Sequence, residues 1–322
     1  MPVPSENQRA AGGTAVSVRG LTKRFGEVLA VDSLTFEVAP GRITGFLGPN
    51  GAGKTTTLRM LLGLIRPTAG EGLIGGRPYA ALRQPLHTVG AALEATGFHP
   101  GRSGRDHLRV IAATHGVPDR RVDELLELVG LAGAARRRAG GYSMGMRQRL
   151  GLAAALLGDP QVLLLDEPAN GLDPEGIRWL RGFLRHLADG GTTVLVSSHL
   201  LSEVEQTADD VVIIARGQLV RQGPIEELHG PPTVLVRSPQ PEELARAVRT
   251  AGLEGAPAPD QGPGAFTVEG ASLATVGDAA RAGGVTVHEL RALRTDLERL
   301  YFRLTQQQDP VLAQPQPDGE AP

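Results

Sequence analysis

The sequence contains no cysteine among its 322 residues, and only 3% of them are aromatic. The lack of thiols excludes disulfide bonds and thiolate metal sites. No apolar run approaches the roughly 18 residues of a membrane-spanning helix, so we expect no such helix in this chain. Met1 to Gly13 is polar and has no apolar centre, which predicts a disordered tail rather than a secretory signal.

The sequence also has no large excess of positive or negative charge. The chain carries 33 Lys+Arg against 35 Asp+Glu, a formal net charge of −2. Proteins that bind nucleic acid usually present a basic face, so we expect no nucleic-acid partner. Lysine itself is scarce, because only Lys23 and Lys54 are present and arginine supplies the remaining positive charge. A lysine at position 54 therefore indicates a place where a compact ammonium fits and a planar guanidinium does not.

Lys54 lies in a glycine-rich segment that fits the pattern G-x-x-x-x-G-K-[ST] of phosphate-binding loops. A buried strand is expected over 43–47 and a helix after the loop, which is the context that this pattern requires. Backbone N–H groups at such a helix start bind phosphates, and the lysine reaches the β- and γ-phosphates. The alternative is an ordinary glycine-rich turn. The expected nucleotide-binding residues are Gly48, Pro49, Asn50, Gly51, Ala52, Gly53, Lys54, Thr55 and Thr56.

Two carboxylates follow an apolar strand that is expected over 162–165. A buried strand brings Asp166 and Glu167 to the carboxyl edge of a sheet, where a phosphate loop also ends. Mg²⁺ prefers hard oxygen ligands, so we expect Asp166 and the Thr55 hydroxyl to hold Mg²⁺. Glu167 would orient and polarise the attacking water. The alternative is a strand that ends in acids for solubility.

Strands alternate with helices as far as residue 230, which predicts an α/β fold with a mainly parallel sheet. The stretch 102–140 is expected to be a helical insert. After Pro231-Pro232, strands and helices at 233–237, 242–250, 253, 265–268, 273–282 and 285–287 suggest a small ferredoxin-like unit. We expect a loop over 255–264.

A leucine pattern follows this unit, with spacings of three and four residues at positions 290, 293, 297, 300 and 304. It predicts a helix that either packs on its own domain or forms a dimer seam. Residues 306–322 have the composition of a disordered tail. The predicted organisation is therefore a tail over 1–14, a large domain over 15–230, a small α/β domain over 231–305 and a second tail.

Several further segments occur in an order that resembles the ATP-binding cassette (ABC) ATPases. Ser143, Met144, Gly145 and Met146 begin a variant of the family's signature motif, which starts 23 residues before Asp166 of the Asp166-Glu167 pair. Asp173 ends a segment similar to the D-loop, and His199 follows a strand as the switch histidine does. Phe25 stands where the family stacks an aromatic ring on adenine. The resemblance covers residues 15–230.

The resemblance implies a P-loop NTPase cassette with an antiparallel β subdomain and a helical insert. Two cassettes would meet head to tail around two ATP molecules, with Mg²⁺ as cofactor. Each ATP would lie on one chain's phosphate loop and be capped by the partner's signature residues. His199 would contact the γ-phosphate, and Glu167 and His199 would be the catalytic residues.

One position departs from the family pattern. The coupling loop usually carries a glutamine, and Glu94 takes that place here. An ionised carboxylate about 4 Å from a phosphate oxygen would cost about 4 kcal/mol at an effective dielectric constant of about 20. Glu94 therefore either ligates the metal or points away. With Gly97-Phe98-His99-Pro100 after it, this segment is similar to the drug and peptide-antibiotic exporter branch.

The resemblance thus implies the ATPase subunit of an exporter for a drug or antibiotic. Its partners would be a second copy of the cassette and a separately encoded transmembrane permease at the cytoplasmic face of the membrane. An importer ATPase is the nearest alternative, and a soluble cassette protein without a transport role is a further one. The latter class carries two cassettes and a basic linker, or a long coiled coil, and this sequence shows neither.

Overall fold

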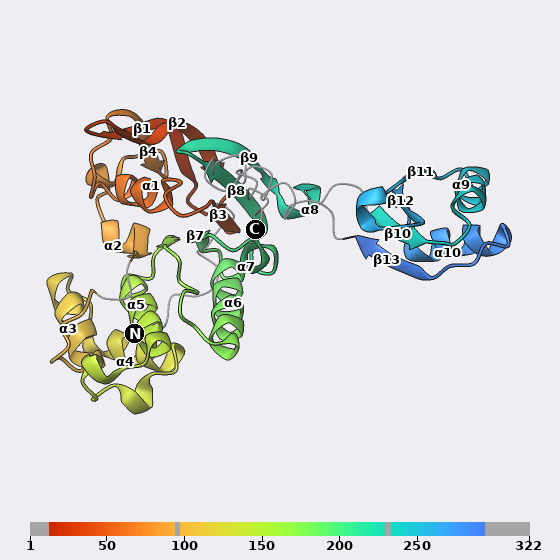
Figure 1. Cartoon of the computed structure of the whole chain (residues 1–322). Helices are drawn as coiled ribbons and strands as arrows, with labels where there is room; N and C mark the ends of the chain where they lie inside the picture. The colour runs from red at the N-terminus through yellow and green to blue at the C-terminus, as the bar shows by residue number, and fades with distance from the viewer. Residues whose placement is uncertain (1–12, 94–96, 229–232, 294–322) are drawn as a thin grey trace, which may run out of the picture. The chain divides into compact units, whose positions relative to one another are not determined.

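The computed structural model describes residues 13–93, 97–228 and 233–293. By its internal contacts the chain divides after Ile225 into two units, a few residues before the expected boundary at 230 (Figure 1). Glu94, residues 1–12 of the predicted first tail and all of the second tail lie outside the described residues.

The first unit is built on a six-stranded sheet in the order β5-β6-β7-β3-β8-β9. All neighbouring strands are parallel except the last pair, β8 and β9. Every residue of β3, β6 and β7 is buried, as expected for a parallel sheet covered on both faces. The mainly parallel sheet is thereby confirmed. Its strands are β3 (Ile43–Leu47), β5 (Val89–Ala92), β6 (Val162–Leu165), β7 (Thr193–Ser198), β8 (Asp210–Ala215) and β9 (Gln218–Pro224).

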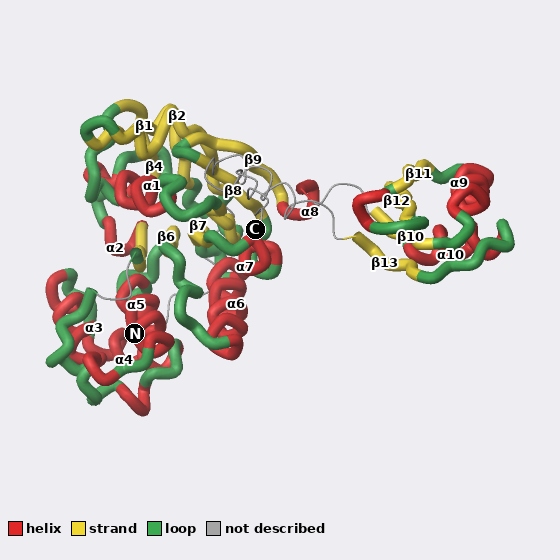
Figure 2. Tube along the Cα trace, viewed as in Figure 1, coloured by secondary structure: helices red, strands yellow, loops and turns green. Residues whose placement is uncertain are grey.

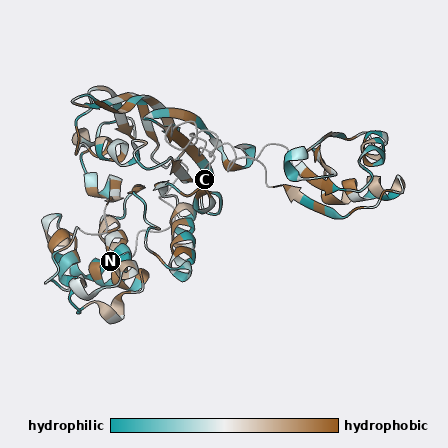
Figure 3. Cartoon of the chain, in the orientation of Figure 1, coloured by the Kyte–Doolittle hydropathy of each residue, from teal (hydrophilic) through white to brown (hydrophobic). Residues whose placement is uncertain are grey.

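A second, antiparallel sheet has the order β2-β1-β4, with β1 (Val16–Phe25), β2 (Val28–Val38) and β4 (Ala69–Ile74). Both β1 and β2 are longer than the sequence pattern suggested, because shifts in their pairing register interrupt the apolar alternation. Phe36 of β2 and Phe46 of β3 join the two sheets, with ring centroids 5.3 Å apart. Hydrophobic residues recur along the strands of both sheets (Figure 3).

Helices connect and flank these strands: α1 (Lys54–Leu61), α2 (Pro85–Thr88), α5 (Met144–Ala155), α6 (Pro174–Asp189) and α7 (Leu201–Glu205). The helical insert contains α3 (Gly104–Thr114) and α4 (Asp119–Leu128), and Figure 2 shows it without strands. Short 3₁₀ turns lie at Tyr79–Ala81, Ala132–Ala134 and Ala139–Gly141. Ser103 caps α3 by accepting a hydrogen bond from the backbone N–H of Asp106.

The second unit begins within α8 (Ile225–Leu228) and contains a four-stranded antiparallel sheet in the order β11-β12-β10-β13. Along the chain its elements are β10 (Thr233–Arg237), α9 (Pro241–Thr250), β11 (Glu254–Pro257), β12 (Ala265–Glu269), α10 (Leu273–Ala282) and β13 (Glu289–Leu293). This sequence of elements and this strand order are those of the ferredoxin-like fold, as predicted. A core that includes Val236, Leu244, Val248, Phe266 and Val276 lies between the sheet and both helices.

Two predictions in this unit were wrong. Residues 285–287 form no strand, because Val285 packs into the core after the turn that ends α10, and pairing with β10 starts only after His288. Leu290 and Leu293 consequently lie in β13 and not in a helix. Leu290 packs toward the helices and Leu293 toward Leu235, as a three-residue step in a strand requires. Leucines 297, 300 and 304 lie outside the described residues.

The loop predicted over 255–264 is also shorter than expected. Gly255 to Pro257 pair with Phe266 to Val268 as part of β11. A 3₁₀ turn at Pro259–Gln261 then closes the connection to β12. Residues 255–257 are glycine, alanine and proline, which show no strand pattern in the sequence. Their strand conformation is therefore evident only from their pairing with β12.

Candidate active site

The phosphate-loop sequence connects the end of β3 to the start of α1, as predicted. Residues 48–53 form the loop, and Lys54, Thr55 and Thr56 begin the helix. Gly53 has φ 100°, and a Cβ there would lie 2.6 Å from the Ala30 carbonyl oxygen, so only glycine fits. No side chain among the described residues caps the start of α1. Its first N–H groups therefore remain available to an anion.

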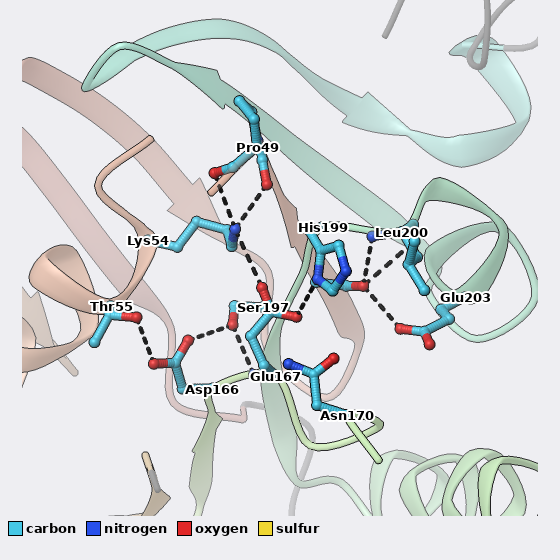
Figure 4. A network of polar contacts seen from close by, with 12 residues as sticks. Pro49, Lys54, Thr55, Asp166, Glu167, Asn170, Ser197, His199, Leu200 and Glu203 are labelled. Carbon is cyan, nitrogen blue, oxygen red and sulfur yellow. Dashed lines mark hydrogen bonds and ion pairs between the residues drawn. The ribbon is translucent and has the colours of Figure 1, made fainter. Parts of the chain in front are cut away.

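Lys54 is almost fully enclosed, with 6% of its surface exposed. Its Nζ donates hydrogen bonds to the carbonyl oxygens of Gly48, at 2.7 Å, and Pro49, at 3.2 Å (Figure 4). The same Nζ lies 3.1 Å from Oε1 of Glu167. The ammonium is thus paired and hydrogen-bonded inside the loop, as a buried charge requires.

Thr55 and Asp166 meet although they are far apart in the sequence. The Thr55 hydroxyl donates a 2.6 Å hydrogen bond to Oδ2 of Asp166. Two hard oxygens therefore lie side by side at the carboxyl edge of the sheet. The described residues contain no cluster of three or more His, Asp or Glu side chains that could hold a metal. Mg²⁺ usually takes one or two carboxylates together with substrate phosphates and water, so this pair fits that ion.

Glu167 connects Lys54 to His199. Its Oε2 lies 2.8 Å from Nδ1 of His199, while its Oε1 faces Lys54. The backbone of Glu167 is left-handed, with φ 48°, a conformation uncommon for residues other than glycine. A carboxylate, an ammonium and an imidazole thus form one network, which can bind an anion and accept a proton.

Ser197 is a member of this network to which the sequence assigned no role. It is fully buried in β7, and its hydroxyl donates to Oδ1 of Asp166 at 2.5 Å. The hydroxyl also accepts the backbone N–H of Glu167 at 2.9 Å. The parallel register pairs Leu165 with Val196, which brings the next residues of each strand together. That register depends on the order of the strands in the sheet. The contact of Ser197 with Asp166 could therefore be predicted from the sequence only if β7 were known to lie beside β6.

The signature residues lie in a different place. Ser143 caps α5, its hydroxyl accepting the N–H of Met146 at 3.3 Å. Asp173 caps α6 in the same manner, with the N–H of Gly176 at 2.7 Å. A pocket of about 470 Å³ is lined by both caps together with Met144, Gly145 and Met146. None of the described residues that line it belongs to the phosphate loop or to the Lys54–His199 network.

Two further predicted site residues remain apart from the network. Phe25 ends β1 and is 47% exposed, with Nζ of Lys23 4.8 Å from its ring centroid. A ring this exposed has surface free for stacking. Glu94 follows β5 but lies outside the described residues, so its metal-binding role stays a prediction.

Charged and buried polar groups stiffen the helical insert. Arg105 of α3 donates two hydrogen bonds to the carboxylate of Asp123 in α4, at 2.6 and 2.8 Å. This contact lowers the pKa of Asp123 and raises the pKa of Arg105. Burial raises the pKa of Tyr142, whose hydroxyl donates to the carbonyl of Ala134 at 2.7 Å. The insert is therefore fixed to the segment immediately before Ser143.

Comparison with known families gives two matches. Residues 31–170 match the ABC transporter family, and residues 232–298 match a family described as a domain of unknown function. Among solved structures, an ATP-binding subunit of an ABC transporter superposes with a TM-score of 0.60 at 27% identity, covering 66% of this chain and 91% of that one. A nucleotide-free ABC cassette gives the same TM-score at 21% identity, which supports the fold alone.

Curated relatives share more sequence. The bacitracin transport ATP-binding protein BcrA of Bacillus licheniformis is 44% identical over 218 residues, 67% of this chain and 71% of its own length. The daunorubicin resistance ATP-binding protein DrrA3 of Streptomyces coeruleorubidus is 41% identical, covering 67% and 70%. The lantibiotic transport ATP-binding protein SrtF of Streptococcus pyogenes is 35% identical, covering 64% and 89%. This chain belongs to the ABC transporter family, as an ATP-binding subunit with ATPase activity.

Proposed function

We propose that this chain is the ATP-hydrolysing subunit of an exporter for a drug or antibiotic. Relatives at 35–44% identity carry names that refer to bacitracin transport, daunorubicin resistance and lantibiotic transport, which supports this class of cargo. Within 13–93, 97–228 and 233–293, every helix is too short or too polar to cross a bilayer. In this proposal a separate permease provides the transport path, and this subunit binds it at the cytoplasmic face of the membrane.

The phosphates of ATP bind along residues 48–56. The start of α1 supplies N–H donors, and Lys54 exchanges the loop carbonyls and Glu167 for the β- and γ-phosphates. Phe25 offers its exposed ring to adenine. Thr55 and Asp166 hold Mg²⁺, which when bound neutralises charge on the phosphates.

Glu167 acts as the general base in hydrolysis. When the triphosphate binds Lys54, Glu167 loses its contact with the ammonium but keeps its contact with His199. The Glu167 carboxylate can then accept a proton from the attacking water. His199 positions the γ-phosphate beside that water. The observation that carries this proposal is that Lys54, Glu167 and His199 form one network at the carboxyl edge of the sheet, and that Ser197 joins Asp166 to it.

Two chains are needed to complete each site. The signature pocket of one chain shares no described lining residue with its own Lys54 network, although α5 presents a capped N-terminus there. A helix N-terminus attracts anions. The start of α5, from Ser143 to Met146, therefore caps the γ-phosphate bound by a partner copy. ATP then joins the two copies, and hydrolysis releases them.

The test uses Lys54→Ala and Glu167→Gln, with Glu37→Gln, an exposed acid on β2, as the matched control. Lys54→Ala should lose binding of the fluorescent analogue mant-ATP. Glu167→Gln should bind mant-ATP, form a dimer in size-exclusion chromatography with ATP, and hydrolyse it about 10²- to 10⁴-fold more slowly. ATP binding by Lys54→Ala at wild-type affinity would contradict the assignment of the site.

The export function needs a cellular test. The chain should co-purify from membranes with a separately encoded permease and should raise resistance to an exported antibiotic. Glu167→Gln should co-purify equally and abolish the resistance. Resistance that persists with this variant would refute transport driven by this ATPase.

A further inference from the structure

The hydroxyl of Ser197 lies between the two acids on which the proposed reaction depends. It receives a hydrogen bond from the Glu167 N–H and donates one to the Asp166 carboxylate. Figure 4 shows these contacts beneath the Lys54–His199 network. A hydroxyl has a single proton to donate, so both partners together fix its orientation.

We infer that Ser197 is a positioning residue for ATP hydrolysis, which holds the side chain of Asp166 and the backbone of Glu167 in one hydrogen-bonded chain. This inference rests on the roles proposed above for the two acids. Ser197 is hydrogen-bonded to Asp166 and Glu167, and it acts through these two neighbours.

The effect on Asp166 is to fix the rotation of its carboxylate. Oδ1 accepts from Ser197 and Oδ2 accepts from Thr55, so a hydroxyl holds each oxygen. The backbone N–H of Asp166 also donates to the carbonyl of Ala92 at 3.0 Å. Outer partners of this kind orient the groups that bind a metal, and their loss commonly weakens metal affinity about 10- to 100-fold.

The effect on Glu167 is to hold a strained backbone. Its φ of 48° turns the chain sharply after β6 and directs the carboxylate toward Lys54 and His199. Such a conformation persists only where surrounding contacts determine it. Without the Ser197 hydroxyl, the Glu167 N–H would lose its acceptor and the turn would lose this constraint.

The neighbouring residue, Ser198, makes different hydrogen bonds, so the proposed positioning role belongs to Ser197 and not to both serines. The Ser198 hydroxyl donates to the carboxylate of Glu203 at 2.8 Å and accepts the N–H of Leu200 at 2.9 Å. Ser198 therefore shapes the loop that carries His199. Ser197 thus positions the two acids, and Ser198 positions the loop of the histidine.

The experiment compares Ser197→Ala with Ser197→Thr and Thr193→Val. Ser197→Thr keeps the hydroxyl, and Ser197 is one of the residues that line a cavity of about 30 Å³. Thr193 is a matched control, because it is buried in the same strand and its hydroxyl also accepts a backbone N–H, that of Gly41. The first readout is hydrogen–deuterium exchange of the Glu167 amide in the nucleotide-free protein. The second is the ratio of mant-ATP dissociation constants in EDTA and in Mg²⁺.

Ser197→Ala should speed exchange of the Glu167 amide at least about tenfold, because its only described acceptor is removed. It should also reduce the Mg²⁺-dependent ratio about tenfold or more. Ser197→Thr and Thr193→Val should match the wild type in both readouts. Equal values for Ser197→Ala and Thr193→Val would overturn the inference.

Two outcomes separate this inference from the proposed function. If the wild type binds no nucleotide with Mg²⁺, the proposed function fails, while amide exchange in the nucleotide-free protein still tests Ser197. If Ser197→Ala does not fold, the wild-type protein decides: a Glu167 amide that exchanges as fast as an exposed one overturns the inference, and a protected amide that Ser197→Thr preserves supports it.

Discussion

Glu167→Gln should destabilise the nucleotide-free protein as well as slow hydrolysis. In that state the Glu167 carboxylate lies 3.1 Å from the buried ammonium of Lys54 and 2.8 Å from Nδ1 of His199. Glutamine keeps an oxygen acceptor but removes the charge, and Lys54 retains two carbonyl partners. A hydrogen bond to a charged group contributes about 1.5–3 kcal/mol, so we expect a loss of about 2 kcal/mol. For a unit of this size that lowers the melting temperature by about 4–8 °C.

The assay is a double-mutant cycle on thermal and urea unfolding, with Lys54→Met, Glu167→Gln and the double variant. The coupling free energy between the two positions should be about 2 kcal/mol, since neither single variant preserves the pair. Glu37→Gln supplies the baseline for an exposed acid. Saturating ATP should remove the difference in free energy of unfolding between Glu167→Gln and the wild type, because the phosphates replace the lost partner of Lys54. A coupling energy below about 0.5 kcal/mol would refute this account of the nucleotide-free site.

Three further outcomes follow from the geometry. Gly53→Ala should lose mant-ATP binding, because its Cβ would lie 2.6 Å from a backbone carbonyl, whereas Gly182→Ala, which meets nothing within 4 Å in α6, should bind normally and be as stable as the wild type or slightly more so. The contact of Arg105 lowers the pKa of Asp123, so its stabilisation is present at neutral pH and is lost as the pH falls through that lowered pKa. The difference in urea midpoint between the wild type and Arg105→Ala should accordingly shrink in acid, and a constant difference would contradict the linkage. Truncation after residue 293 should weaken ATP-free dimerisation if Leu297, Leu300 and Leu304 form a dimer seam, and equal dimer affinity in sedimentation experiments would exclude that seam.

Local sequence was sufficient for the central elements of the first unit. Uninterrupted apolar runs such as 162–165 marked the buried strands, and the residues after them marked the carboxyl edge of the sheet. The phosphate loop could be placed because glycine and a single lysine are required there together. These features depend on nearest neighbours along the chain, and the sequence contains them directly.

What the sequence did not reveal depends on contacts between distant segments. Ser197 meets Asp166 only because β7 lies beside β6 in a particular register. Leu290 and Leu293 fit a helical spacing, yet pairing with β10 placed them in a strand. Gly255 and Pro257 are poor strand formers that became an edge strand through β12 alone. In each case tertiary pairing outweighed the local pattern.

The contact between Lys54 and Glu167 has a consequence for the resting enzyme. Without nucleotide, the group that would deprotonate water is engaged by the group that would grip phosphate. In the proposed mechanism ATP itself releases the base, because its phosphates take the place of Glu167 beside Lys54. Binding of the substrate and release of the catalytic base from Lys54 then occur together.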